Sequence, residues 1–379
     1  MPISVNNKSQ CSGCYACYSV CPKKCIKMTS DTEGFQYPVV DESKCISCGL
    51  CDKTCPIIHS KNNNQNETIG YAVKAKDDSI RMNSSSGGAF YLLASYVIDN
   101  GGVVFGAAFD EKCNVKHIYI DNKKDIQRLQ KSKYVQSKIG DSFLKAQQFL
   151  REKRHVLFTG TPCQIAGLRS FLNKEYVNLI TQDIACFGVP SPLVWEKYKD
   201  SLENQAKARV ENVNFRDKST GWKDYSLRIV LDKGKDYVIN HNDSSYMQDF
   251  LFRYSLRPSC YDCHFKGVKR NSDITLADFW GIDKMMPDFH DDIGVSLVIT
   301  QTEKGKKLFN NISKETIFVE ADLAIAAKHN TAIVESVQLN EERKTFFRKL
   351  KKGSYKAAHN AAKRKHFANV VRRKLLKNR

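Results

Sequence analysis

The feature that most constrains this chain is a run of four cysteines that occurs twice near its beginning. The first run contains Cys11, Cys14, Cys17 and Cys21. The second run repeats this spacing 34 positions later, and a proline follows the last cysteine of each run. Two such runs at one offset indicate a duplicated unit. This pattern is typical of bacterial two-cluster ferredoxins, in which the fourth cysteine of each run binds the cluster of the other run.

That rule predicts two 4Fe–4S clusters and assigns four ligands to each. The first ligand set is Cys11, Cys14, Cys17 and Cys55. The second ligand set is Cys45, Cys48, Cys51 and Cys21. A zinc ribbon is the alternative, but it uses two pairs of cysteines rather than two runs of four that end in proline. The ferredoxin interpretation is therefore preferred.

Composition limits the cellular setting. The 379 residues are 41% hydrophobic and 27% charged, which excludes a disordered chain. No apolar stretch reaches the roughly 20 residues that span a bilayer, and the first residues lack a basic segment followed by an apolar one. We therefore expect a cytoplasmic location, where 14 cysteines are better explained by metal binding than by disulfides.

The pattern along the chain predicts a mixed α+β and α/β architecture in four parts. Residues 1–59 are the ferredoxin domain, 60–69 a polar linker, 70–340 a mixed-sheet body and 341–379 a basic helical tail. Within the body, strands are predicted at 71–75, 102–109, 155–159, 177–186, 210–230 and 273–279. Helices are predicted at 89–98, 142–151 and 165–172. This alternation favours a partly parallel sheet.

The tail holds most of the excess positive charge, contributing +13 of the formal net charge of +19. Its apolar residues recur at helical spacing, and they are Phe346, Phe347, Leu350, Val370, Val371, Leu375 and Leu376. Such a helix either lies on an anionic membrane surface or packs these residues on the body. The second interpretation is favoured, and peripheral membrane contact stays open.

Six cysteines lie outside the two runs. Cys260 and Cys263 form a pair on one turn, Cys163 follows a predicted strand at the start of a helix, and Cys186 ends the next strand. In a parallel sheet the last two lie at the same edge, so these four thiols are candidates for a third cluster. A reactive cysteine or a redox-active pair is the alternative. The other two, Cys25 and Cys113, are predicted to be packed thiols.

Four further motifs occur in order along the body. They are residues 84–90 (Ser-Ser-Ser-Gly-Gly-Ala-Phe), 133–137 (Lys-Tyr-Val-Gln-Ser), 160–164 (Gly-Thr-Pro-Cys-Gln) and 270–281, which contains Asp-Phe-Trp-Gly. With these motifs, roughly residues 70–310 resemble the coenzyme F-420 hydrogenase/dehydrogenase beta-subunit family. The resemblance implies an iron–sulfur flavoprotein that binds FAD beside a 4Fe–4S cluster, and it favours the third cluster. Relatives include bacterial proteins found among surface-polysaccharide enzymes.

The resemblance also implies where FAD binds. Ser85, Ser86, Gly87 and Gly88 precede a helix, where backbone N–H groups favour a pyrophosphate. Lys131, Lys133 and Ser137 are candidates for contacts with the flavin or its phosphates. The alternatives are an ordinary helix cap and an exposed basic strand. Arg270, Asp273, Asp278 and Trp280 are further candidates for the pocket wall, and no catalytic acid or base is assigned.

Three functions compete at this point. The first is an FAD- and 4Fe–4S-dependent oxidoreductase that passes electrons from ferredoxin-type clusters through FAD to a small organic acceptor, with a soluble electron carrier protein as partner. The second is an electron-relay subunit of a larger complex, without its own substrate site. The third, a nucleic-acid or membrane-surface protein, is the least favoured because the basic excess is confined to the tail.

Overall fold

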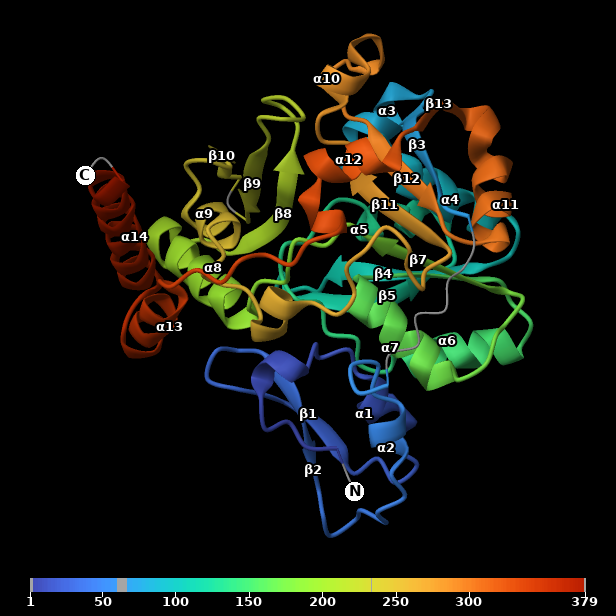
Figure 1. Ribbon diagram of the computed structural model, residues 1–379, viewed down its shortest axis with the longest axis horizontal. Coiled ribbons are helices and arrows are strands. Elements are labelled where there is room, and N and C mark those ends of the chain that lie inside the picture. Colours follow the sequence, from blue (N-terminus) through green and yellow to red (C-terminus); the bar gives the residue numbers. More distant parts are fainter. Residues whose placement is uncertain (1–2, 60–66, 233, 378–379) are drawn as a thin grey trace.

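The computed structural model describes residues 3–59, 67–232 and 234–377, with side chains of the last helix described through residue 369. The first 59 residues form a small unit at one side of a larger α/β body (Figure 1). Of the predicted linker, residues 60–66 lie outside the described residues. The overall mixed α/β architecture with a ferredoxin-like N-terminal region is confirmed.

The N-terminal unit keeps the internal duplication of its sequence in its backbone. Helices α1 (Ala16–Val20) and α2 (Leu50–Lys53) each carry the third cysteine of a run. The residues before them, Tyr15 and Gly49, are 34 positions apart and share the left-handed conformation, with φ of 69° and 72°. Strands β1 (Ile26–Ser30) and β2 (Gln36–Val40) pair antiparallel beside the helices. The repeated spacing therefore produces a repeated turn.

The body is built on an eight-stranded sheet in the order β13-β3-β12-β11-β7-β6-β4-β5. Its strands are β3 (Ile69–Ala75), β4 (Val103–Phe109), β5 (Val115–Ile120), β6 (Val156–Thr159), β7 (Leu179–Ile184), β11 (Ile274–Asp278), β12 (Ser296–Thr300) and β13 (Thr316–Ala321). The four central strands β4, β6, β7 and β11 are parallel, and the outer pairs are antiparallel. The predicted partly parallel sheet is thus confirmed.

Helices cover both faces of this sheet, which is why strands β6 and β12 are buried along their whole length. Helices α4 (Ala89–Asp99) and α11 (Glu303–Ile312) share one apolar cluster with the sheet. Helices α6 (Ser142–Arg151) and α7 (Pro162–Leu172) share another on the opposite face. Shorter helices α3 (Asp78–Met82), α5 (Ile126–Leu129), α10 (Ile282–Met285) and α12 (Leu323–His329) lie around it.

A second, smaller sheet lies beside the large one (Figure 1). It has the strand order β10-β9-β8, with β8 (Val210–Asp217), β9 (Ser226–Leu231) and β10 (Asp236–Asn240) all antiparallel. Helices α8 (Pro192–Ala206), α9 (Ser245–Leu251), α13 (Arg343–Lys352) and α14 (Tyr355–Lys377) belong to this part of the fold. The sequence indicated strands here but not a separate sheet.

The tail forms two helices, α13 and α14, that pack on the second sheet's core. Phe346, Phe347 and Leu350 are buried in the same apolar cluster as Trp195 of α8. Arg343, at the start of α13, donates a hydrogen bond to Glu33 of the N-terminal unit. The predicted packing of these three tail residues on the body is confirmed, while the side chains of the other four lie outside the described residues. Among the described helices, none combines the length and apolar character that crossing a membrane requires.

Candidate iron–sulfur centres and cofactor cavity

The two N-terminal ligand sets predicted from the spacing each line a separate small hollow. Cys11, Cys14, Cys17 and Cys55 line the first, with a volume of about 20 Å³. Cys21, Cys45, Cys48 and Cys51 line the second, also about 20 Å³. The structure therefore brings the fourth cysteine of each run to the set of the other run. Within the described residues, no group of three or more Cys, His, Asp or Glu side chains has an arrangement that could hold a single metal ion. The four cysteines of each set instead surround a hollow, which is the arrangement expected of ligands to a cluster of several atoms.

The second hollow has a fifth thiol that sequence reasoning did not assign to it. Cys25 also lines this hollow, and its Sγ lies 3.3 Å from Sγ of Cys21. It is buried, as predicted, but beside the ligand set rather than in unrelated packing. Backbone N–H groups reach two other sulfurs of the set, from Ile3 to Cys51 at 3.3 Å and from Ser47 to Cys45 at 3.5 Å. Hydrogen bonds of this kind tune the potential of a bound cluster.

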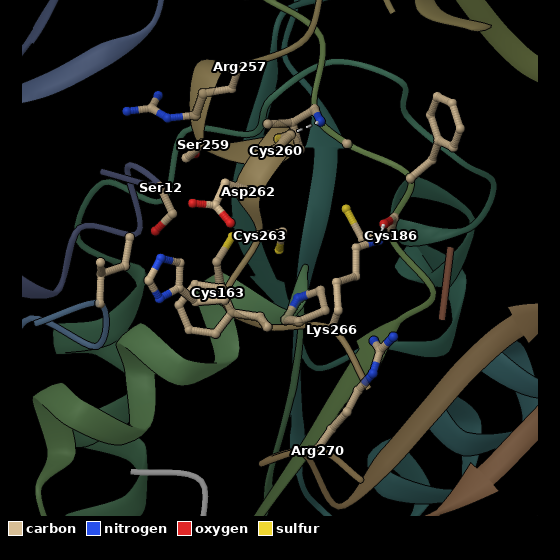
Figure 2. Close-up of a pocket in the computed structure, with 17 residues that line it drawn as sticks. Ser12, Cys163, Cys186, Arg257, Ser259, Cys260, Asp262, Cys263, Lys266 and Arg270 are labelled. Atoms are coloured by element: carbon tan, nitrogen blue, oxygen red, sulfur yellow. Dashed lines mark hydrogen bonds between the residues drawn. The ribbon is translucent and has the colours of Figure 1, made fainter. Parts of the chain in front are cut away.

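The four remaining candidate cysteines also converge. Cys163, Cys186, Cys260 and Cys263 line one cavity of about 30 Å³ and surround a common space (Figure 2). Cys163 lies in the first turn of α7, and Cys186 follows β7 at the same edge of the parallel sheet. The other two lie in and directly after the 3-10 turn Pro258–Asp262. Sheet topology and a distant turn together produce this third set.

Burial of the third set is partly offset by polar groups beside its thiols. Burial raises the pKa of Cys163, Cys186 and Cys260, to about 12 for Cys260, and neighbouring thiols add to the effect. Metal binding deprotonates such ligands outright. The backbone N–H of Val189 points to the Cys260 sulfur at 3.4 Å, and Lys266 donates to the carbonyl oxygen of Cys186. These groups favour negative charge within the cavity.

The N-terminal unit contacts the third set directly. Its residues Ser12 and Ile57 line the third cavity, and Ser12 is next to Cys11 in the chain (Figure 2). On helix α7, Gly167 lies against Cys14, so close that a Cβ at this glycine would meet the Cys14 Sγ at 3.0 Å. Only glycine allows this approach without displacement. The first set is therefore held against the element that carries Cys163.

A fully buried arginine joins the two units at this contact. Arg257 donates to the backbone oxygens of Cys11 at 2.8 Å and Gln36 at 2.9 Å, and to Oε1 of Gln136 at 3.0 Å. Its guanidinium also lies 4.3 Å from the centre of the Tyr37 ring. Because Arg257 also lines the third cavity, one side chain touches the surroundings of two thiol sets. Nothing in the local sequence singled it out.

A much larger cavity, of about 510 Å³, opens beside the third set. Cys186 lines both cavities. Six of the predicted FAD contacts line the large cavity, namely Ser85, Ser86, Gly88, Lys131, Lys133 and Ser137. The seventh, Gly87, packs away from it, since a Cβ there would meet the backbone oxygen of Val73 at 2.1 Å. Gly87 thus lets the serine-rich loop approach β3.

Two of these residues are oriented by their neighbours. The Lys133 ammonium donates to the backbone oxygens of Arg128 and Gln130, at 3.0 and 2.6 Å, so it supports the loop that lines the cavity. Ser137 is 2.6 Å from Nδ1 of His117, whose Nε2 is 3.0 Å from the oxygen of Thr159. Burial lowers the pKa of His117 to about 4. The neutral ring therefore donates to Thr159 and accepts from Ser137, leaving the serine lone pairs for a ligand.

The candidates from the fourth motif separate in space. Asp278 and Trp280 line the large cavity, Arg270 lines the third thiol cavity, and Asp273 lines neither. Asp273 is fully buried and accepts hydrogen bonds from Thr181 and Arg169. Asp278 pairs with a buried arginine that sequence reasoning missed, Arg216, at 3.1 Å. Aromatic rings lie on this guanidinium, at 4.0 Å for Tyr225 and 5.0 Å for Trp280.

Thiol sets in series beside a large cavity define the class of the protein as an iron–sulfur electron-transfer protein. Residues 10–57 match the family model of the 4Fe-4S dicluster domain. Residues 153–324 match the family model for the C terminus of the coenzyme F420 hydrogenase/dehydrogenase beta subunit. Two separate parts of the chain are thus similar to a 4Fe–4S dicluster domain and to the C-terminal region of the coenzyme F420 hydrogenase/dehydrogenase beta subunit, and the resemblance inferred from the motifs is confirmed.

Among solved structures, a chain of the F420-reducing [NiFe] hydrogenase complex from Methanosarcina barkeri is similar at 16% sequence identity and a TM-score of 0.47. The similarity covers 72% of this chain and 89% of that chain. No curated protein matches the chain.

Proposed function

We propose that this protein is an FAD- and 4Fe–4S-dependent oxidoreductase that reduces a small organic acceptor with electrons supplied one at a time by a carrier protein. The observation that carries the proposal is the serial arrangement of three thiol sets and one large cavity. The first set touches the wall of the third through Ser12, and Cys186 lines both the third set and the cavity. In this scheme electrons pass from the second set to the first, then to the third and the cavity.

The residues of the cavity fit FAD in size and chemistry. A volume of about 510 Å³ lies within the range of cofactor pockets. The serine-rich loop ends at Gly88, the residue before α4, and Lys131 adds positive charge on the same cavity. Such groups suit a pyrophosphate. When bound, FAD would supply the conversion between single electrons and a transferred pair. The chain's own residues position it, through Ser137 and the loop held by Lys133.

The twelve thiols fit three 4Fe–4S clusters. Each set has four cysteines around its own space, and backbone N–H groups point to sulfurs in the second and third sets. Surface-polysaccharide chemistry is the first substrate class we propose to screen, because relatives implied by the motifs occur among such enzymes. The large cavity supports a substrate site of this chain's own.

An electron-relay subunit without substrate chemistry is the second candidate. It is favoured by the family description, which names a beta subunit of a hydrogenase or dehydrogenase. A relay would exchange electrons with two proteins and reduce no small acceptor on its own. The length of the body, residues 70–340, argues against this candidate, because it is far more than a relay between clusters needs.

The decisive measurement is iron, sulfide and flavin content per chain after anaerobic purification and reconstitution. We expect about twelve irons and one FAD in the unaltered chain, and about eight irons in a Cys260→Ser/Cys263→Ser variant. Cys113→Ser is the matched control, because Cys113 is buried in the core of the second sheet and lines none of the three hollows. It should keep all its iron. A flavin-free chain after reconstitution would overturn the flavoprotein proposal, and eight irons in every variant would overturn the third cluster.

Stopped-flow reduction then separates the two functions. Flavin bleaching by a protein carrier should be fast in the unaltered chain and lost in the Cys260→Ser/Cys263→Ser variant. Turnover of a small acceptor by the isolated chain supports the oxidoreductase. Co-purification with a catalytic partner, together with inactivity toward every acceptor, supports the relay.

A further inference from the structure

The second thiol set is the one that meets the protein surface. Among all fourteen cysteines, each within the described residues, Cys48 is the one that is exposed. The first set lies against α7 and Arg257, and the third set is enclosed by the body and the N-terminal unit. Electron exchange between proteins weakens steeply with distance. On the electron path proposed above, on which this inference rests, a protein carrier can therefore come close only to the second set.

Apolar side chains surround this exposed cysteine. Ile46 and Leu50 line the same hollow as Cys48, yet they are 58% and 39% exposed to solvent. They lie two residues to either side of it in a single loop that leads into α2. A solvent-exposed apolar pair directly over a redox centre is typical of a surface that another protein covers.

Lysines border the same surface. Lys23, Lys24 and Lys53 are exposed, and Lys23 also lines the hollow of the second set. Among the described acidic side chains, none forms an ion pair with these three lysines. Two acidic side chains of the same unit have partners of their own, since Asp41 pairs with Lys44 at 3.3 Å and Asp52 lies 3.5 Å from His59. An apolar centre with a basic rim is complementary to an acidic protein with an apolar patch.

We propose that this surface, termed here the outer face and formed by Lys23, Lys24, Ile46, Cys48, Leu50 and Lys53, docks a small acidic one-electron carrier protein. The carrier passes its electron to the cluster of the second set and leaves oxidised. Two such encounters supply the electron pair that the acceptor takes up with protons from solvent. Lysines steer the approach, and the apolar pair makes the close contact.

The test compares two reductants of the reconstituted holoprotein by stopped flow. One is a reduced bacterial ferredoxin of net negative charge, and the other is reduced methyl viologen, a small cation that needs no docking surface. The Lys23→Glu/Lys24→Glu/Lys53→Glu variant should react with the ferredoxin about tenfold or more slowly at low ionic strength. Its reduction by methyl viologen should not be slowed. Added salt should slow the ferredoxin reaction of the unaltered protein and narrow the difference from the variant.

Matched controls carry the same change of charge elsewhere. Lys76→Glu/Lys307→Glu/Lys314→Glu alters three exposed lysines near helix α11 and should keep the ferredoxin reaction close to that of the unaltered protein. Ile46→Ser/Leu50→Ser removes the apolar pair without changing charge, and it should slow the ferredoxin reaction at both low and high salt. Ile317→Ser/Val319→Ser, two exposed apolar residues on β13, is its control.

Equal ferredoxin rates in the outer-face variants and their controls, without salt dependence, would overturn the docking proposal. This result is distinct from failure of the proposed function. If methyl viologen reduces the iron–sulfur centres but no electrons reach flavin or acceptor, the oxidoreductase fails, while slow ferredoxin reduction of the outer-face variants still supports docking.

Discussion

The two cysteine runs have the same spacing, yet the structure places their ligand sets in opposite environments. In the first, Cys14 lies against Gly167 of the body and Cys11 is held through Arg257. In the second, Cys48 is exposed between two apolar side chains. The comparison teaches that spacing decides which thiols meet, whereas docking of the N-terminal unit decides which set is internal and which faces other molecules.

The two cysteine runs are similar in backbone conformation as well as in spacing. Gly13 and Ser47, at equivalent positions of the two runs, both have positive φ, as do Tyr15 and Gly49. Nothing in these turns distinguishes an inner from an outer site. The difference arises entirely from what packs on them, and variants at matched positions of the two sets test it.

The largest expected effect comes from removing one predicted ligand from the first set or from the second set. The two variants are Cys14→Ala and Cys48→Ala, which are altered at equivalent positions of the two runs. Each should lower the iron content by about four atoms. On the proposed path, Cys14→Ala should also block carrier-driven reduction of the flavin and lower the unfolding temperature, because the first set lies at the contact between the units. Cys48→Ala should leave the flavin reducible by methyl viologen. Carrier-driven flavin reduction in Cys14→Ala would contradict the serial order.

The second prediction concerns the arginine at that contact. Arg257→Met should destabilise the protein by about 3 kcal/mol, because acceptors on Cys11, Gln36 and Gln136 lose a buried charged donor. A lower apparent unfolding temperature in a fixed-rate scan measures it. Arg209→Met, at an exposed ion pair with Asp232, is the control and should change stability by less than about 1 kcal/mol. Equal shifts would show that Arg257 does not hold the units together.

The third prediction compares two glycines, Gly167, which contacts Cys14 of the first set, and Gly49, which follows Cys48 of the second. Gly167→Ala forces a methyl group onto Cys14, where the Cβ would meet Cβ at 2.8 Å. Overpacking of this kind costs about 1–3 kcal/mol, and it should also disturb the first cluster's spectrum. Gly49→Ala meets nothing within 4 Å but keeps a positive φ, which costs about 1–2 kcal/mol. Its spectrum should stay unchanged. Thermal unfolding with electron paramagnetic resonance checks both, and a disturbed spectrum in Gly49→Ala alone would reverse the comparison.

The smallest effect is expected at Cys25, the extra thiol of the second set. Its S–H is placed to donate to the Cys21 sulfur at 3.3 Å, which stabilises the reduced, more negative cluster. Cys25→Ala should therefore lower the potential of the second cluster and leave that of the first unchanged. A redox titration followed by electron paramagnetic resonance measures both potentials. Cys25→Ser, which keeps a donor, should restore part of the difference; equal potentials in all three proteins would show that the thiol only packs.

Much of the fold followed from local pattern. The predicted helix at 142–151 coincides with α6, and the strand at 71–75 lies within β3. Buried strands and amphipathic helices are recognisable because their side chains meet the core at fixed periods. No strand was predicted at β12 or β13, although β12 is buried along its whole length. The second sheet was seen only as strand-like sequence.

The residues of the candidate site also fall into two groups, those that the sequence pattern indicated and those that it did not. Cysteine spacing and motif order pointed to twelve of the thirteen thiols that line the three hollows, and six of the seven proposed FAD contacts line the large cavity. Arg216, Arg257 and Cys25 gave no such signal. The two arginines contact residues that are distant in the sequence, and Cys25 contacts Cys21 without belonging to the repeated cysteine spacing. The role of a single arginine or cysteine outside a motif cannot be predicted until the residues around it in the fold are known.

The sequence by itself therefore determined the ligand sets, since a thiolate cluster needs four sulfurs and tight turns at fixed spacing bring three of them together. It also determined the parallel sheet whose edge carries Cys163 and Cys186. Only the tertiary structure decided the order of the sets and the exposure of Cys48. These depend on Gly167, Arg257 and Glu33, whose contacts span as many as 310 positions along the chain. Local spacing carries no information about such contacts, because they form only when separate elements pack.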